Sequence, residues 1–126
     1  IILIPHVLNL TYVQNTGAAF GIGSDSTSMF VAVNVVIIGL ITYFIFSKKE
    51  ELSKLILIAL HLVLAGGIGN LIDRIARGFV IDYIDISPLI KYPVFNLADI
   101  FVVIGCLIIA VFLVKDTVIK KKNIGE

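Results

Sequence analysis

Three long apolar runs constrain this chain more than any other feature of its sequence. They cover about residues 29–47, 55–73 and 94–114, and each approaches the ~20 residues that a helix needs to cross a bilayer. Any one of them alone is also compatible with a buried core helix. With 59% hydrophobic and 15% charged residues, however, the chain has too little polar surface to cover three such helices in water. We therefore predict a mainly α-helical, polytopic membrane bundle that forms one membrane-embedded domain over residues 1–126.

The distribution of positive charge predicts how these spans are oriented. Seven of the ten Lys and Arg residues lie between the first two spans or after the third: Lys48, Lys49, Lys54, Lys115, Lys120, Lys121 and Lys122. The positive-inside rule places both regions in the cytoplasm, so segments 1–28 and 74–93 are expected on the outer face. Because the chain opens at Ile1 and its single methionine is Met29, we expect one further span upstream, giving four in the complete protein.

The most polar part of the chain lies between the second and third spans. Residues 69–99 contain four aspartates, two asparagines and two arginines. Asn70 and Asn96 each precede an aspartate, Asp73 and Asp99, by three residues, and on a helix that spacing places both side chains on one face. These residues fit a wet loop as well, but charged groups at membrane depth are costly and usually functional. We interpret them as two polar faces directed at a common space.

Paired carboxylates suit one kind of chemistry in particular. Two that share a proton let one activate a water molecule while the other donates a hydrogen bond to a carbonyl group, which is how aspartic peptidases work. The sequence contains no HExxH zinc motif and no GxSxG nucleophile elbow, and Cys106 lies in mid-span. A carboxylate-only metal site lacks a convincing ligand set. The residues alone leave open whether Asp73 or Asp82 partners Asp99.

Two outer segments are predicted to be extended. Residues 7–22 contain short β-prone stretches and a turn at Asn15-Thr16-Gly17, and the small residues 17–19 suit either a plain turn or close approach to a ligand. Residues 78–85, GFVIDYID, read as a second strand. Alternation there places Val80, Asp82 and Ile84 on one side, and apolar neighbours raise the pKa of a carboxyl group by desolvation. A small outer-face β-sheet is the expected result.

Four motifs in order resemble those of the lipoprotein signal peptidases, or signal peptidase II. They are NTGAAF at Asn15–Phe20, GNLIDR at Gly69–Arg74, GFVIDYID at Gly78–Asp85 and FNLADI at Phe95–Ile100. The resemblance extends over about residues 8 to 114. It implies a bacterial inner-membrane aspartic endopeptidase that removes signal peptides from diacylglyceryl-modified prolipoproteins, cutting before the lipidated cysteine, with its active site toward the outer face.

The resemblance also assigns roles to individual residues. Asp82 and Asp99 would form the catalytic pair, and the binding or supporting residues would be Asn15, Gly17, Asn70, Asp73, Arg74 and Asn96. The family's architecture is four membrane helices with a small outer-face β-cradle; its first helix, which bears an acidic motif of its own, has no counterpart in this chain. Asp73, with Arg74 beside it, is expected to belong to a structural charge network.

Several expectations about function and partners follow. We expect no cofactor, no bound metal and no nucleic-acid partner, a lipid-modified prolipoprotein as substrate in contact with membrane lipids, and a monomer. A small ion- or proton-translocating subunit is the alternative, because intramembrane aspartates also serve proton relays. A relay needs acidic groups through the whole membrane depth, whereas the aspartates of residues 69–99 gather toward one side. A purely structural bundle leaves the clustered carboxylates unexplained.

Overall fold

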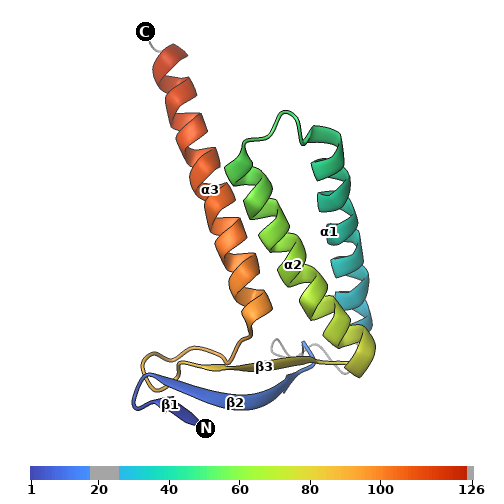
Figure 1. Cartoon of the computed structure of the whole chain (residues 1–126), viewed down its shortest axis with the longest axis vertical. Coiled ribbons are helices and arrows are strands. Elements are labelled where there is room, and N and C mark those ends of the chain that lie inside the picture. Colours follow the sequence, from blue (N-terminus) through green and yellow to red (C-terminus); the bar gives the residue numbers. More distant parts are fainter. Residues whose placement is uncertain (18–25, 125–126) are drawn as a thin grey trace.

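Three long helices stand on a small β-sheet in the computed structural model, which describes residues 1–17 and 26–124 (Figure 1). In chain order the elements are β1 (Ile2–Ile4), β2 (Leu8–Asn15), α1 (Ser26–Lys48), α2 (Lys54–Arg77), β3 (Val80–Asp85) and α3 (Leu97–Ile124). Residues 18–20 of the NTGAAF motif lie outside the described part. The predicted combination of a helix bundle with a small sheet is confirmed.

All three helices are long and apolar enough to cross a membrane. In α1 and α3 only 6% of the most apolar window is buried within the protein, against 22% in α2. An apolar helix that is exposed on most of its surface is stable in a lipid environment and costly in water. The chain is therefore a multi-pass membrane protein, with α2 as its most enclosed helix.

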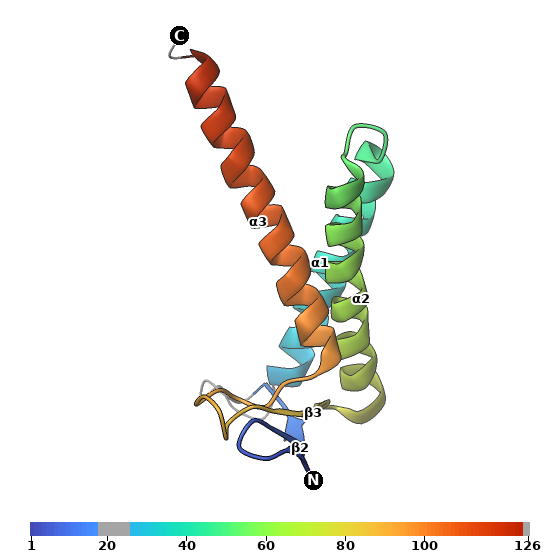
Figure 2. The same ribbon diagram turned by 60° about the vertical axis from the view of Figure 1, so that its left-hand side comes forward.

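The central helix α2 packs against both of the others, and its contact with α3 is the more extensive. Two glycines permit this closeness: a Cβ at Gly66 would overlap the Ala98 carbonyl oxygen, and one at Gly105 would overlap that of Ala59. Small residues at such crossings let helix backbones approach in a membrane. Figure 2 shows that α3 leans away from α1 and α2 toward its C-terminus, so the three helices converge at the end that faces the sheet.

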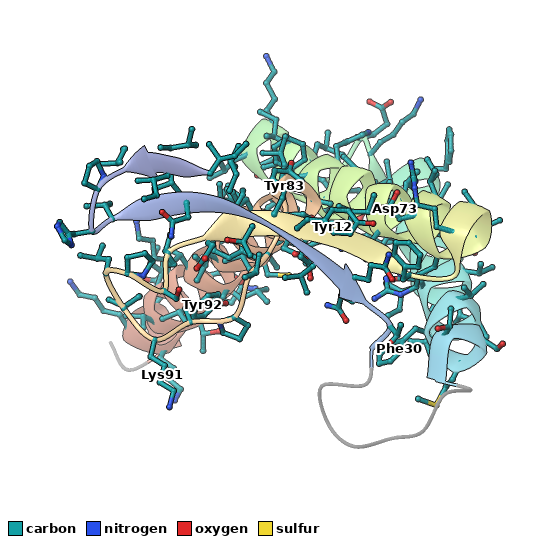
Figure 3. The ribbon with its side chains drawn as sticks, turned by 90° about the horizontal axis from the view of Figure 1, so that it is seen from below. Tyr12, Phe30, Asp73, Tyr83, Lys91 and Tyr92 are labelled. Carbon is teal, nitrogen blue, oxygen red and sulfur yellow. The ribbon has the colours of Figure 1, made fainter. Side chains whose placement is uncertain are left out.

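The sheet is antiparallel, with strand order β1-β2-β3. Its register shifts between Leu10 and Val13 of β2, which is the signature of a β-bulge. Seen from below, β2 and β3 pass in front of the helix ends, and the labelled side chains of Phe30 on α1 and Asp73 on α2 lie near them in this view (Figure 3). Along β3 the side chains of Val80 and Asp82 are both 2% exposed, so the predicted common face for these two is observed.

The ends of two helices differ from the predicted boundaries. Helix α2 continues to Arg77, where the Gly78 N–H closes it by donating to the Arg74 carbonyl oxygen; Arg74 is thus helical and not part of an outer loop. Helix α3 begins at Leu97 rather than near residue 94, because Phe95 is extended and pairs with Ile84 of β3. This bridge holds the residues just before α3 against the sheet.

Candidate active site

The first turn of α3 is closed by a pair of reciprocal hydrogen bonds. Asp99 N donates to Asn96 Oδ1 at 3.0 Å, and Asn96 N donates to Asp99 Oδ2 at 3.0 Å. This is the geometry of a capping box, in which the residue before the helix and the residue three positions later satisfy each other's backbone N–H groups. The three-residue spacing between Asn96 and Asp99 therefore has a local structural reason as well as a place in the site.

Asp82, on β3, receives two side-chain hydrogen bonds. Asn15 Nδ2 donates to its Oδ2 and Asn96 Nδ2 to its Oδ1, both at 2.9 Å. Asn15 comes from β2, so the carboxylate is held between a neighbouring strand and the start of α3. Asp82 and Asn96 are respectively 2% and 5% exposed, and buried polar groups of this kind are stable only when hydrogen-bonded.

Asn70 of α2 links this pair to Asp99. Its Oδ1 accepts from Asn96 Nδ2 and its Nδ2 donates to Asp99 Oδ1, both at 2.9 Å. Asp82 and Asp99 are thus connected through the two asparagines Asn96 and Asn70, which belong to different elements. The predicted common space is observed for Asn70, Asn96 and Asp99, and Asp82 joins them from β3. The prediction is wrong for Asp73, whose oxygens bond elsewhere.

Several effects act on the pKa of Asp82. Burial of the carboxyl raises its pKa above the ordinary value, and the nearby negative charge of Asp99 raises it further. The hydrogen bonds from Asn15 and Asn96 and the positive charge of Arg74 oppose this, because they favour the ionised form. The net direction is upward, so Asp82 keeps a proton to higher pH than an exposed aspartate does.

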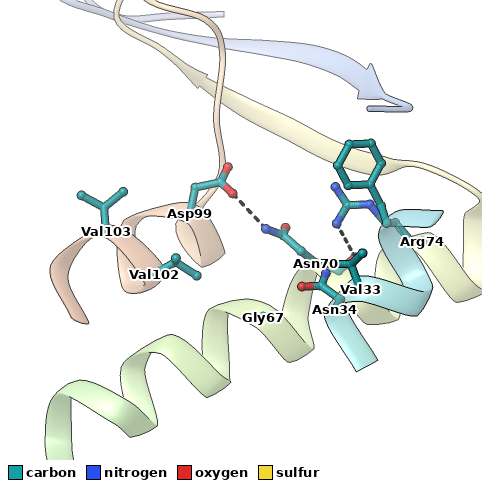
Figure 4. Close-up of a pocket in the computed structure, with 9 residues that line it drawn as sticks. Val33, Asn34, Gly67, Asn70, Arg74, Asp99, Val102 and Val103 are labelled. Carbon is teal, nitrogen blue, oxygen red and sulfur yellow. Dashed lines mark hydrogen bonds between the residues drawn. The ribbon is translucent and has the colours of Figure 1, made fainter. Parts of the chain in front are cut away.

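Asn70, Arg74 and Asp99 also line a cavity of about 300 Å³ between the three helices (Figure 4). Arg74 lies over the Phe30 ring, with its guanidinium carbon 5.3 Å from the ring centroid, a cation–π geometry. Its Nη1 donates to the Asn70 carbonyl oxygen at 3.5 Å. The cavity therefore presents a carboxylate and a guanidinium beside apolar walls, and sequence reasoning did not identify Phe30 as the residue that positions the arginine.

Asn15 and Gly17 are brought together by a local turn. The Gly17 N–H donates to Asn15 Oδ1 at 2.8 Å, which leaves the Asn15 amino group directed at Asp82. Gly17 has φ of 81°, a conformation that side chains disfavour, and a Cβ there would collide with the Phe30 ring. Gly17 therefore forms a turn that packs against Phe30, and its predicted approach to a ligand stays a prediction.

Asp73 makes its hydrogen bonds outside the Asp82–Asp99 network. Its Oδ1 accepts from Arg77 Nη1 at 2.6 Å and its Oδ2 accepts from Ile81 N at 3.0 Å. The predicted charge network exists, but the ion-pair partner is Arg77, one helical turn on, and not the adjacent Arg74, whose side chain points to another face. Asp73 ties the end of α2 to β3, next to Asp82, and thereby supports the site from outside.

Asp85, at the other end of β3, belongs to a separate cluster. It accepts hydrogen bonds from Thr11 Oγ1 at 2.8 Å and from Ser87 N at 2.9 Å. Hydrogen bonds from Ser87 and Thr11 lower the pKa of Asp85. Asp82 and Asp85 lie on one strand and are both buried, yet their pKa values are shifted in opposite directions.

Comparison with known proteins agrees with this geometry. Residues 1–115 match the family model described as signal peptidase (SPase) II. The chain belongs to the signal peptidase II family. Lipoprotein signal peptidases of Staphylococcus aureus, strains Newman and N315, are each 40% identical over 122 residues, which is 96% of this chain and 74% of theirs.

Solved structures give the same result. Two structures described as a bacterial membrane enzyme, determined by the in meso method, match 92% of this chain at 38% identity. Their TM-scores are 0.82 and 0.84, with 71% and 75% of their own chains covered. The predicted family and enzyme class of this signal peptidase II are thus confirmed, and the alternative of an ion- or proton-translocating subunit is not favoured.

Proposed function

We propose that this chain is an aspartic endopeptidase of the bacterial inner membrane that cleaves signal peptides from diacylglyceryl-modified prolipoproteins before the lipidated cysteine, with Asp82 and Asp99 as the catalytic pair. One observation carries the assignment of the pair. The two carboxylates come from β3 and α3, are linked through Asn96 and Asn70, and interact electrostatically. Asp73 makes no hydrogen bond to any of these residues, and its two oxygens are used elsewhere.

Hydrolysis of a peptide bond needs a group that takes a proton from water and a group that donates a hydrogen bond to the carbonyl oxygen. Because burial raises the pKa of Asp82, we assign to Asp82 the proton that is donated to the substrate carbonyl. Asp99, which borders the open cavity, then accepts the proton of the attacking water. Arg74, in the same cavity, favours the negative charge that develops in the transition state.

The location of the substrate follows from the same arrangement. The cavity is lined by residues of all three helices, whose surfaces suit lipid, so we expect an apolar signal segment to reach it laterally from the bilayer. Seven of the ten basic residues lie at the end of the bundle remote from the sheet, which supports an outward-facing sheet and active site. We expect the enzyme to act as a monomer and without metal.

The test is turnover of a lipidated prolipoprotein peptide by purified Asp82→Asn and Asp99→Asn variants. Each is expected to lose roughly 10²–10⁴ in kcat, because an amide neither accepts the proton of water nor shares one. Asp85→Asn is the matched control: Asp85 is also buried on β3 and accepts two hydrogen bonds, so this variant carries a similar structural cost outside the cavity. Asp73→Asn should retain turnover while lowering the unfolding temperature.

Two results would contradict the proposal. Substantial turnover by a folded Asp82→Asn protein would show that another carboxylate is the partner of Asp99, with Asp73 the first replacement to examine. If the wild-type enzyme cleaves the same peptide equally well without its lipid, the proposed lipoprotein substrate is wrong, whereas the assignment of the carboxylate pair still stands.

A further inference from the structure

Asn34 is a polar side chain within the apolar helix α1, and it lines the same cavity as Arg74 and Asp99 (Figure 4). Within a membrane, a side-chain amide is costly unless it finds a hydrogen-bond partner. In membrane bundles the usual partner of such an amide lies on a neighbouring helix. In the described part of the chain, however, the Asn34 side chain is hydrogen-bonded to no other residue.

The cavity is built from one face of each helix. Its lining residues follow helical spacing on α1 (Phe30, Val33, Asn34), on α2 (Gly67, Asn70, Arg74) and on α3 (Asp99, Val102, Val103). Residues three or four apart share a helix face, so Asn34 points into the cavity beside Val33 and one turn beyond Phe30. Its direction is set by the helix and needs no local distortion.

The depth of Asn34 follows from its neighbours along α1. Phe30 lies against Arg74, and Ile38 lies against Gly67, where a Cβ would be 3.5 Å from Ile38 Cγ1. Asn34 is midway between Phe30 and Ile38 on the same face, and so lies at the level of Asn70. Asn70 donates to Asp99. The unpaired amide and the carboxylate of Asp99 therefore border the cavity at one depth.

The other polar side chains of the cavity are already engaged. Asn70 bonds to Asn96 and Asp99, Arg74 bonds to the Asn70 carbonyl oxygen, and Asp99 bonds to Asn70 and to Asn96 N. A peptide segment opened for cleavage in this space brings N–H and C=O groups that have lost their partners, and in a membrane each such group needs a new one. The Asn side chain has both a donor and an acceptor, so it complements a peptide group in either direction.

We propose that Asn34 binds a backbone peptide group of the substrate close to the bond that is cleaved, and so positions that bond against Asp99. This inference rests on the proposed function, since it requires a peptide in the cavity. It assigns a substrate-binding role to α1, a helix from which the sequence motifs supply no residue. The interaction is with the backbone, so it tolerates different signal-peptide sequences.

The experiment compares wild-type enzyme with Asn34→Leu, which keeps the size of the side chain but removes its hydrogen bonding, on a lipidated peptide substrate. We expect kcat/KM to fall roughly three- to tenfold, as for the loss of one neutral hydrogen bond, with an unchanged unfolding temperature. Thr42→Val is the matched control, because it removes a polar group from the same helix two turns beyond Asn34 and outside the cavity lining. This control should cleave like wild type.

A second substrate series identifies the contact. Esters replace, one at a time, the peptide groups that flank the cleaved bond, which removes an N–H and weakens the carbonyl as an acceptor. At one position the ester should slow wild-type enzyme and leave Asn34→Leu unaffected, so that the two losses are not additive. If Asn34→Leu does not fold, Asn34→Ser, which is shorter and removes the amide group, replaces it.

The outcomes separate the two proposals. If wild type does not cleave the lipopeptide, the proposed function fails. If wild type cleaves it and folded Asn34→Leu or Asn34→Ser has the same kcat/KM, only the role of Asn34 is overturned. If Asn34→Leu loses kcat/KM by the same factor with every ester, Asn34 has a structural role and the inference is overturned. The same holds if its loss of kcat/KM accompanies a lower unfolding temperature and an unchanged KM.

Discussion

Asn96 offers the sharpest test of how the site is held together, through the substitution Asn96→Asp. The change is nearly isosteric, and the remaining Oδ1 still accepts the Asp99 N–H that closes the first turn of α3. What changes is the amino group. In the wild type, Nδ2 donates to Asp82 Oδ1 and to Asn70 Oδ1, both at 2.9 Å. In the variant an oxygen replaces Nδ2, so both of these acceptor oxygens face another acceptor.

The expected cost follows from these two contacts. A buried neutral hydrogen bond contributes about 0.5–1.5 kcal/mol, so the loss of both should lower the free energy of unfolding of Asn96→Asp by roughly 1–3 kcal/mol at neutral pH. The new carboxyl group lies beside Asp82 and Asp99, which raises its pKa in the folded state. For an acid whose folded pKa is raised, stability is present at low pH and is lost as pH rises through that pKa. The defect should therefore shrink on acidification.

The assay is thermal unfolding in detergent over a range of pH, with turnover of a lipopeptide measured alongside. Asn123→Asp is the control, since it makes the same chemical change on an exposed residue near the far end of α3 and is expected to alter stability by no more than about 0.5 kcal/mol. An Asn96→Asp protein that unfolds at the wild-type temperature at neutral pH and cleaves at the wild-type rate would refute the bridging role of Asn96.

Two further predictions concern the turn at residues 15–17. Asn15→Ala removes a hydrogen bond that lowers the pKa of Asp82, so the pKa of Asp82 should rise further. The limb of the pH–rate profile that belongs to Asp82 should then move to higher pH. A limb that stays in place or moves to lower pH would contradict this assignment. Gly17→Ala combines an unfavourable positive φ with a collision against the Phe30 ring. We expect it to destabilise the protein by about 1 kcal/mol or more and to slow turnover by displacing the ring that contacts Arg74. Unchanged kinetics and an unchanged unfolding temperature would show that the turn relaxes without disturbing Phe30.

Much of the fold could be predicted because it depends on local patterns. Continuous apolar runs specify the three helices, and alternation in β3 buries Val80 together with Asp82 while leaving Tyr83 more exposed. The start of α3 was harder to predict from the sequence. Apolar character continues through Val94 and Phe95, and only the pairing of Phe95 with Ile84, a contact across the chain, keeps these residues extended and moves the helix start to Leu97.

The site was predictable as a set of residues but not as a set of contacts. Spacing along the chain indicated Asn70, Asn96 and Asp99, and the family resemblance favoured Asp82 over Asp73. Neither says which side-chain oxygen faces which amide. Asp73 illustrates the limit: the adjacent charge suggested Arg74 as its partner, whereas helical geometry pairs it with Arg77 at i+4. Asn34 carried no motif at all, and its position on the cavity wall emerges only when α1 is packed against α2.

Two backbone N–H groups determine which side chains donate and which accept in the hydrogen-bond network. Gly17 N occupies the oxygen of Asn15, and Asp99 N occupies the oxygen of Asn96, so both side chains must present their amino groups to Asp82. Asn96 in turn donates to the oxygen of Asn70, which leaves the Asn70 amino group for Asp99. Neither Asn15 nor Asn96 can turn its amide over without leaving a partly buried N–H group facing an amino group instead of an oxygen, which is unfavourable. In the proposed mechanism, donors fixed in this way need no reorganisation when charge moves between the carboxylates. The proposal therefore gives the glycine turn and the helix cap a part in catalysis, through the orientation of Asn15 and Asn96.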